Sequence, residues 1–463
     1  MKKSLLWIVV LLLSIAMVAV FSLASCKAKE VAEEEEAPAV EEEVAEEEEA
    51  LPPLEERTPL KFWYNPSIGE DGRRLYQRFS DEVWPLDMMP VATPFEENII
   101  TKWATGERPD ILDFQTETQW IGQLQAGKNM VDLRDMEFVK RTKYDLLNRS
   151  VGCVGPNGEV YGAILSGIQN MGFIYYKPIF EELGLSIPKD AEEFIALCQK
   201  IKDAGHLPLY IGLIDGYPGN QYFHALLTDP IKELEESKGI SWCDEINRGV
   251  RSFGDDGVMQ EAFDVITTLT NSGYFQKDFV GGTFEGCLTS LINGEAAMVM
   301  QGTWVVGVLA GAYGLDEVNE KIGMFALSMN SNTATGGITT PSFYVPKTGN
   351  SVTEQGAKEF IKWVTGTGPY GEAYQEYVTN AGILATIEGY ADGEESLSAI
   401  KEMNSYAKVS QATIWWTGLA AGVGNMDTYS QNVFAGTWTV DDLTKALDES
   451  FAKNAQLMGL PGW

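Results

Sequence analysis

Short apolar runs alternate along this chain with longer segments of helical spacing. The run PLKFWYNPSI (59–68) is typical of a buried strand leading into a loop, and the next segment has apolar residues at the helical positions Leu75, Phe79 and Val83. Strands that alternate with helices in this way predict an α/β fold with mostly parallel sheets. Further strands are expected within 98–114, 161–176, 296–301, 321–327 and 333–346.

Helical segments follow from the same periodicity. The strongest is predicted over 190–205, with Asp190 as the N-cap residue, Cys198 on the buried face and Gly205 just after the last turn. The segment GLIDGYPGNQYF (212–223) is interpreted as a loop. Other helices are expected within 98–114, within 115–133 with an end near Gly127, before Gly184, within 259–273 and 283–294, within 358–378 with a break around Gly366–Pro369, and within 439–455.

The first residues predict an export signal. Two lysines precede an apolar run over 5–23, which ends in Leu-Ala-Ser-Cys at 23–26. These four residues resemble the lipobox of bacterial lipoproteins, in which the signal is cleaved before the cysteine and the thiol carries a diacylglycerol. We therefore expect 1–25 to be a signal peptide and Cys26 to be lipidated. An uncleaved membrane anchor is the alternative, and both place the rest of the chain outside the cytoplasm.

Residues 26–57 predict an acidic, disordered tether between that anchor and a folded domain. They hold fourteen glutamates between Glu30 and Glu56 and no aromatic residue, so they cannot bury enough surface to offset their ordering entropy. Repulsion between like charges extends such a segment. A metal-binding acidic tail is the weaker alternative, because no histidine or cysteine interrupts the glutamate runs.

The folded part is strongly acidic. The chain carries 67 acidic and 34 basic residues, of which the first 57 positions hold 14 and 5, so residues 58–463 keep 53 and 29 and a net charge of −24. Such a surface repels nucleic acid and anionic solutes. A segment of about 400 residues is too long for one core, so two lobes are expected.

The remaining cysteines show no metal-ligand spacing. Cys153, Cys198, Cys243 and Cys287 could form two disulfides in an exported protein, and three pairings are possible. The buried position of Cys198 favours free structural thiols instead.

Motifs for catalysis are weak. There are two histidines in different contexts, His206 and His224, and neither a HExxH, a GxSxG nor a phosphate-binding loop is present. Gly366–Gly371 fits GxGxxG, but it follows a helix and contains Pro369, so a loop between helices is the better interpretation. A carboxylate pair for glycoside hydrolysis stays open, because its spacing is spatial. We expect no enzyme activity, no cofactor and no metal.

Four stretches carry a family resemblance. They are GERPDILDF with QWIGQLQAG, YGAILSGIQNMGFIYYKPIFEELGLSIPKDAEEF, NGEAAMVMQGTW and FAGTWTVDDLTKALDESF. In this order they resemble signatures of the extracellular solute-binding proteins of ABC importers, specifically the large carbohydrate-binding, maltose-binding-protein-like family. Tyr176 replaces the usual Asn, and Asp190-Ala191 replace Thr-Trp, which affects a turn and a helix start.

The resemblance implies a two-lobed periplasmic-binding-protein fold of type II, with hinge strands between the lobes and the ligand between them. Crossings are then expected near Ser166–Gln169, Asn330–Thr335 and Asn380–Ile387, where Gly167, Gly336, Gly337 and Gly382 are compatible with a hinge. The implied domains are 58–168 plus 332–383 for lobe 1, and 169–331 plus 384–463 for lobe 2.

The resemblance also implies a ligand platform at Trp304. Strand 296–301 is expected to end at the cleft, Gly302 to let backbone approach the ligand, and Trp304 to present its flat apolar face to a sugar ring. Packing under a helix is the alternative for this side chain. Other candidates for ligand contact, each weighed equally against core or rim packing, are Trp63, Asn65, Glu117, Trp120, Gln169, Asn170, Asp215, Tyr217, Tyr222, Gly337, Trp415 and Trp416.

The expected function is capture of an extracytoplasmic carbohydrate, an oligosaccharide, and its delivery to an ABC transporter permease. The expected partners are that ligand, the permease subunits and the membrane through the lipid on Cys26; a monomer is expected, and no nucleic acid. The alternatives are a receptor for a polyamine or peptide, a surface polysaccharide hydrolase, and a sensor subunit for a receptor kinase.

Overall fold

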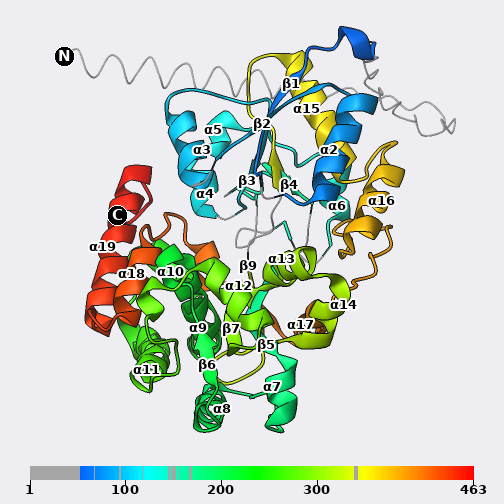
Figure 1. Cartoon of the computed structure of the whole chain (residues 1–463). Coiled ribbons are helices and arrows are strands. Elements are labelled where there is room, and N and C mark those ends of the chain that lie inside the picture. The colour runs from blue at the N-terminus through cyan, green and yellow to red at the C-terminus, as the bar shows by residue number, and fades with distance from the viewer. Residues whose placement is uncertain are drawn as a thin grey trace, which may run out of the picture. The chain divides into compact units, whose positions relative to one another are not determined.

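The computed structural model describes residues 53–66, 68–92, 95–116, 118–143, 146–147, 153–155, 157–165, 169–337 and 342–463. The predicted signal peptide, the lipid site at Cys26 and almost all of the predicted tether lie outside the described residues. Within the described part, none of the helices combines the length and the apolar character that crossing a bilayer requires. The described chain folds around two separate β-sheets (Figure 1).

The first lobe is built on a sheet with the strand order β2-β1-β3-β10-β4. β1 runs parallel to β2 and β3, whereas β10 is antiparallel to β3 and β4. The strands and helices of this lobe are β1 (Leu60–Tyr64), α2 (Glu70–Glu82), β2 (Leu86–Pro90), α3 (Phe95–Ala104), β3 (Ile111–Phe114), α4 (Thr118–Gln123), α5 (Ala126–Asn129), α6 (Glu137–Arg141), β4 (Gly162–Ile164), β10 (Ser342–Tyr344), α15 (Ser351–Val364) and α16 (Gly371–Ala381), after a short 3-10 turn at Leu54–Glu56.

Alternation along β1 gives the first sheet two buried faces. Phe62 packs edge-to-face on Tyr76 of α2 and also contacts Phe360 of α15. Trp63, the next residue, points to the other face, where it joins a cluster with Phe95 of α3. Helices therefore cover both faces, α2 and α15 on one and α3 to α5 on the other (Figure 1).

The second lobe is built on a sheet with the order β11-β9-β5-β7-β6, to which β8 is added by pairing with β5. Its strands and helices are β5 (Gln169–Tyr176), α7 (Lys177–Glu182), α8 (Ala191–Asp203), β6 (Leu207–Tyr210), α9 (Tyr217–Lys238), α10 (Trp242–Asn247), α11 (Val258–Asn271), α12 (Phe284–Ile292), β7 (Ala296–Gly302), α13 (Thr303–Tyr313), α14 (Leu315–Lys321), β8 (Ile322–Phe325), β9 (Ala334–Gly337), α17 (Ser398–Val409), β11 (Gln411–Thr413), α18 (Met426–Phe434) and α19 (Val440–Met458), with 3-10 turns at Leu213–Asp215, Asp255–Gly257, Phe279–Gly281 and Trp415–Gly418.

The central strand of the second sheet explains its continuous apolar sequence. Every residue of β7 is buried, because helices cover both faces. Met298 and Met300 pack toward α8, α9 and α11, whereas Val299 packs toward α12 and α13. The run that ends in Gly302 is thus a fully enclosed strand, as its pattern predicted.

Most predicted elements are confirmed. The helix at α8 starts after Asp190, whose side chain accepts a hydrogen bond from the backbone N–H of Glu193, and Gly205 follows its end with a positive φ of 89°. The break between α15 and α16 falls at the predicted place. The helix expected to stop near Gly127 continues as α5 to Asn129.

Two predictions about strands are wrong. The sheets are mixed rather than mostly parallel, because β5 is antiparallel to β7, β8 and β9, and β10 is antiparallel to both of its neighbours. Segment 333–346, expected as one strand, holds two strands in different sheets, β9 and β10. Its alternation could not reveal this, since both strands are short and buried.

The chain passes from the first sheet to the second between β4 and β5, and back again between β9 and β10. β4 ends at Ile164 and β5 begins at Gln169, on either side of the first of these passages. β9 belongs to the second sheet, although it lies beyond the boundary expected at 332. After α16, Thr386 donates to the carbonyl of Ile164 at 3.2 Å, so this part of the chain still contacts the first lobe. Farther along the chain, Asn319 of the second lobe donates from Nδ2 to the carbonyl of Ser396 at 2.9 Å.

The cysteines of the described chain are thiols and form no disulfide among themselves, as the position of Cys198 suggested. Cys153, Cys198 and Cys287 are buried, and Cys243 is half-buried with its thiol donating to the carbonyl of Trp415 at 3.0 Å. Burial raises the pKa of the Cys198 thiol well above its usual range, which makes it an unreactive core residue.

Candidate functional site

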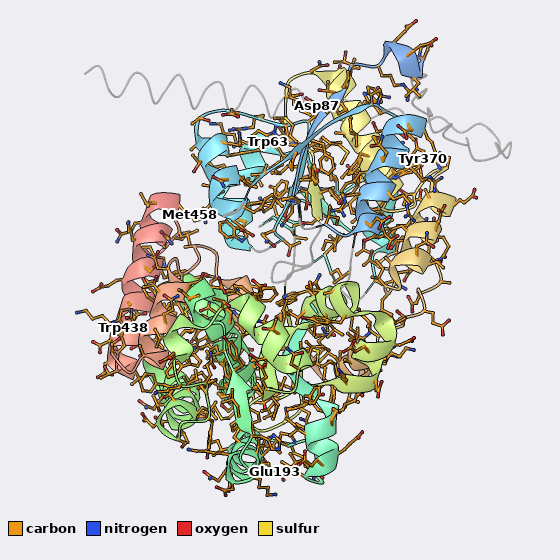
Figure 2. The ribbon with its side chains drawn as sticks, viewed as in Figure 1. Trp63, Asp87, Glu193, Tyr370, Trp438 and Met458 are labelled. Atoms are coloured by element: carbon orange, nitrogen blue, oxygen red, sulfur yellow. The ribbon has the colours of Figure 1, made fainter. Side chains whose placement is uncertain are left out.

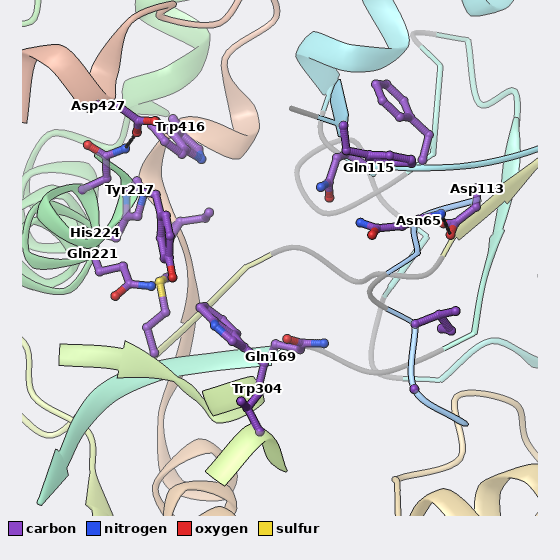
Figure 3. Close-up of a pocket in the computed structure, with 18 of the residues that line it drawn as sticks. Asn65, Asp113, Gln115, Gln169, Tyr217, Gln221, His224, Trp304, Trp416 and Asp427 are labelled. Carbon is purple, nitrogen blue, oxygen red and sulfur yellow. Dashed lines mark hydrogen bonds between the residues drawn. The ribbon is translucent and has the colours of Figure 1, made fainter. Parts of the chain in front are cut away.

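A pocket of about 660 Å³ is lined by residues of both lobes. Figure 3 shows Asn65, Asp113 and Gln115 on one side and Tyr217, Gln221, His224, Trp416 and Asp427 on the other, with Gln169 and Trp304 below. Its volume lies in the usual range for small-molecule sites. The remaining lining residues are Ile68, Gly69, Phe95, Phe114, Met171, Asn220, Val308, Tyr377, Ile383 and Ile414.

Strand ends of the first sheet supply the polar groups on the first side. Asn65 follows β1, and Asp113 and Gln115 lie at the end of β3, so all three sit at the carboxyl ends of adjacent parallel strands. This edge is where ligands bind in open α/β sheets. The backbone N–H of Asn65 donates to Asp113 Oδ2 at 3.2 Å. Burial, and to a lesser degree the charge of Glu96, raises the pKa of Asp113 from 3.8 to about 7.

Trp304 lies in the pocket wall at the second residue of α13. Its indole packs against the apolar clusters on both faces of the second sheet, and it also lines the pocket. Packing in the core and a place in the pocket wall, the two alternatives for this residue, therefore both describe part of its position. The expected reason for Gly302 is wrong. A Cβ on Gly302 would lie 1.8 Å from Cζ3 of Trp304, so the glycine makes room for that indole rather than for a ligand.

Gly302→Ala is expected to push the Trp304 indole out of its place. The φ of Gly302 is −91°, which any residue adopts, so the effect is steric and does not come from backbone strain. Overpacking of this kind costs about 1–3 kcal/mol. Thermal unfolding and ligand titration would measure it. Gly307→Ala on α13, where a Cβ meets nothing within 4 Å, is the matched control, and an equal effect of both changes would contradict this account.

Helix α9 presents a polar stripe to the pocket. Tyr217, Asn220, Gln221 and His224 all line it, and their spacing places them on one helical face. The predicted loop over 212–223 is wrong from Tyr217 onward, because α9 begins there, with Pro218 in its first turn. The candidates predicted from this segment were Asp215, Tyr217 and Tyr222, so three of the four stripe residues were missed. The spacing of the four polar residues was the signal that could have revealed the stripe.

The side chain of Trp416 packs against His224. Their rings meet edge-to-face with centroids 4.2 Å apart, so the histidine supports the indole at the pocket wall. Burial lowers the pKa of His224 to about 3, and the imidazole is therefore neutral at physiological pH. The site thus offers two indoles and a neutral imidazole on the side of the second lobe.

Five of the predicted contact residues line the pocket together: Asn65, Gln169, Tyr217, Trp304 and Trp416. Four aromatic candidates do not line it. Trp63 is buried between the first sheet and α3, in the upper lobe of Figure 2, and Trp120 packs edge-to-face on Phe114. Tyr222 and Trp415 are buried in the core of the second lobe.

The remaining candidates lie near the pocket or outside the described chain. Asn170 is buried in β5, where its side chain accepts from Gln411 Nε2 at 3.0 Å. Asp215 accepts the backbone N–H of Phe284 at the start of α12. Gly337 pairs with Gln169 in the second sheet. Glu117 lies outside the described residues.

Several lining residues were missed because they come from unrelated parts of the chain. Asp427 of α18 meets Asn220 of α9, which lies 207 positions earlier, and Tyr377 and Ile383 come from the region after α15. No local pattern marks any of them. Among the described residues, no cluster of acidic, histidine and cysteine side chains fits a metal ion, and the pocket lining contains neither lysine nor arginine.

A two-lobed α/β fold with an aromatic and amide-lined pocket between the lobes defines a solute receptor. Residues 95–404 match the family described as bacterial extracellular solute-binding protein, and the chain belongs to this family of binding proteins. The resemblance seen in the sequence is thereby confirmed.

Similar proteins bear names that refer to sugars. A multiple sugar-binding protein of Streptococcus mutans is 20% identical over 347 residues, which are 74% of this chain and 78% of that protein. A chitin oligosaccharide binding protein has a similar structure, with a TM-score of 0.70 and 20% identity over 86% of this chain and 100% of its own. The solute-binding protein RafE in complex with raffinose has a TM-score of 0.68 at 20% identity, over 86% and 100%. At such identities the solved structures show the shared fold.

Proposed function

We propose that this protein binds an extracytoplasmic oligosaccharide in the pocket between its lobes and delivers it to an ABC transporter permease. One observation carries the proposal: Trp304, Trp416 and Tyr217 share a pocket with Asn65, Gln115 and Gln221. A sugar ring has an apolar C–H face that suits a flat aromatic group and a rim of hydroxyls that suits amides. The names of the relatives support the same class of ligand.

The volume and charge of the pocket narrow the ligand. A space of 660 Å³ holds roughly 20 groups the size of a water molecule, which is enough for more than one sugar ring. The described lining includes Asp113 and Asp427 and contains neither lysine nor arginine. An uncharged oligosaccharide fits this lining, whereas a sugar acid or sugar phosphate would bring further negative charge next to two acidic side chains.

Delivery follows from closure of the lobes. A ligand that contacts both lobes makes its full set of contacts only when they close, so it shifts the hinge equilibrium toward the closed state. The permease would then recognise the closed receptor. A lipid on Cys26 and the acidic segment up to residue 57 would hold the monomeric receptor near the membrane. This part of the proposal rests on the sequence of the N-terminal residues.

A thermal shift panel tests the proposal. Residues 57–463 would be heated with raffinose, stachyose, chitobiose, xylobiose, spermidine and a mixture of short peptides. A ligand at about 100-fold excess over its dissociation constant stabilises the folded state by roughly 2.7 kcal/mol. We expect a rise in melting temperature with one series of neutral sugars. A rise in melting temperature with spermidine or peptides alone would not affect the family assignment, but it would contradict the assignment of a carbohydrate ligand.

A further inference from the structure

One amide on the first side of the pocket is held in a fixed orientation by a carboxylate. The side chain of Gln115 donates from Nε2 to Glu96 Oε1 at 2.5 Å. A carboxylate only accepts, so the NH₂ group must face Glu96 and the carbonyl oxygen must point elsewhere. That oxygen, Oε1, is buried and has no hydrogen-bond partner in the described structure.

The opposite side repeats this arrangement. Asn220 of the α9 stripe is buried, and its Nδ2 donates to Asp427 Oδ1. The same reasoning fixes its amide, and its Oδ1 is likewise buried without a partner among the described residues. Both residues line the pocket, and a buried acceptor without a donor is costly, so a ligand group that donates to these oxygens would remove that cost.

We propose that two amides, each anchored by a carboxylate, accept hydrogen bonds from hydroxyl groups of the ligand. The pairs are Glu96–Gln115 on the first lobe and Asp427–Asn220 on the second. The inference deepens the carbohydrate function and rests on it. Because the NH₂ group of each amide is held by a carboxylate, only its oxygen is left to bind a ligand, and that oxygen requires a group that donates. The two amides lie on different lobes, so a ligand that satisfies both also joins the lobes.

A hydroxyl fits this lining better than an ammonium group does. An ammonium only donates, which would satisfy the amides. The pocket also carries a donor of its own, since Trp416 Nε1 is buried and has no acceptor in the described part of the chain. A sugar hydroxyl donates and accepts, so neighbouring hydroxyls of one ring can serve both kinds of group.

Glu96→Gln tests the anchor on the first lobe. Glu96 does not line the pocket, so this change leaves the ligand's own contacts in place. A glutamine at this position can donate as well as accept, so the Gln115 amide is free to turn its NH₂ group toward the pocket. We expect the affinity for the panel sugar that binds to fall about five- to tenfold, with the melting temperature of the unliganded protein nearly unchanged.

Asp264→Asn is the matched control. Gln260 Nε2 donates to Asp264 Oδ1 at 2.7 Å on the exposed surface of α11, so this pair has the same chemistry away from the pocket. The change should leave sugar affinity unaltered. A fall in affinity equal to that of Glu96→Gln would mean that the loss is general, and it would overturn the inference.

Deoxyfluoro sugars test whether the amides require a hydrogen-bond donor on the ligand or only a group of similar size. At each hydroxyl of the sugar that binds, the deoxy and deoxyfluoro analogues would be titrated by calorimetry into the wild type and Glu96→Gln. Fluorine cannot donate, so at the hydroxyl read by Gln115 both analogues should bind about five- to tenfold more weakly than the parent sugar, and Glu96→Gln should then add little further loss.

The outcomes are distinguishable. If no panel sugar binds, the proposed function and this inference fall together. If a sugar binds and every deoxyfluoro analogue keeps the parent affinity, the amides do not require a donor and this inference alone is overturned. If spermidine binds and the sugars do not, the acceptors serve a cation, and both statements are again wrong.

Discussion

Trp304→Ala is expected to weaken sugar binding by about 1–3 kcal/mol, by analogy with the loss of an aromatic side chain on which a nucleic-acid base stacks. The indole lines the pocket at the start of α13 and rests on Gly302, so alanine leaves an apolar wall without its flat surface. Isothermal titration with the panel sugar measures the change. Trp304→Phe keeps a flat ring and should recover part of the affinity.

Trp438→Ala is the control for this result. Trp438 packs on Tyr429, with ring centroids 5.2 Å apart, and lies at the surface just before α19, away from the pocket lining (Figure 2). Its loss should leave affinity unchanged. Unaltered affinity of Trp304→Ala would remove Trp304 from the binding site.

Asp113→Asn is expected to stabilise the unliganded protein at pH 8 by on the order of 2–4 kcal/mol, and to have little effect near pH 4. Burial raises the pKa of Asp113 from 3.8 to about 7, and one unit corresponds to about 1.4 kcal/mol. The folded state thus favours the protonated acid. That contribution to stability is complete below about pH 4 and is lost as the pH rises through 7. Asparagine stays neutral throughout.

Urea unfolding between pH 4 and 8 measures this difference. Asp87→Asn is the control, because Asp87 is exposed on β2 at the outer part of the first lobe, and surface changes of this kind stay within about 0.5 kcal/mol (Figure 2). A stability difference between Asp113→Asn and the wild type that stays constant with pH would show that Asp113 does not titrate in this range.

The local parts of the fold could be predicted because their signals are local. Asp190 caps α8 through a contact with Glu193, three residues away, and the break between α15 and α16 lies in a short run of glycine and proline. The family could be recognised for the same reason, since its signatures are short strings at strand ends and helix starts.

The site was less predictable because its parts are brought together from distant positions. Trp304 and Asn65 each follow a recognisable strand, and both line the pocket. Trp63 and Tyr222 look equally suitable in the sequence, but their side chains point into the cores of the lobes. Side chains alternate between the two faces of a strand and point in all directions around a helix, so only the packing of these elements decides which side chain reaches the cleft.

By itself, the sequence determined the alternation of strands and helices, the enclosed strand before Gly302, the caps of α8 and the family of binding proteins. These depend on neighbours within a few residues. Only the tertiary structure decided that β9 and β10 belong to different sheets and that Gly302 makes room for Trp304. It also decided that Glu96 and Asp427 orient two amides that line one pocket. Such contacts join residues up to 207 positions apart, and a local pattern along the chain cannot predict them.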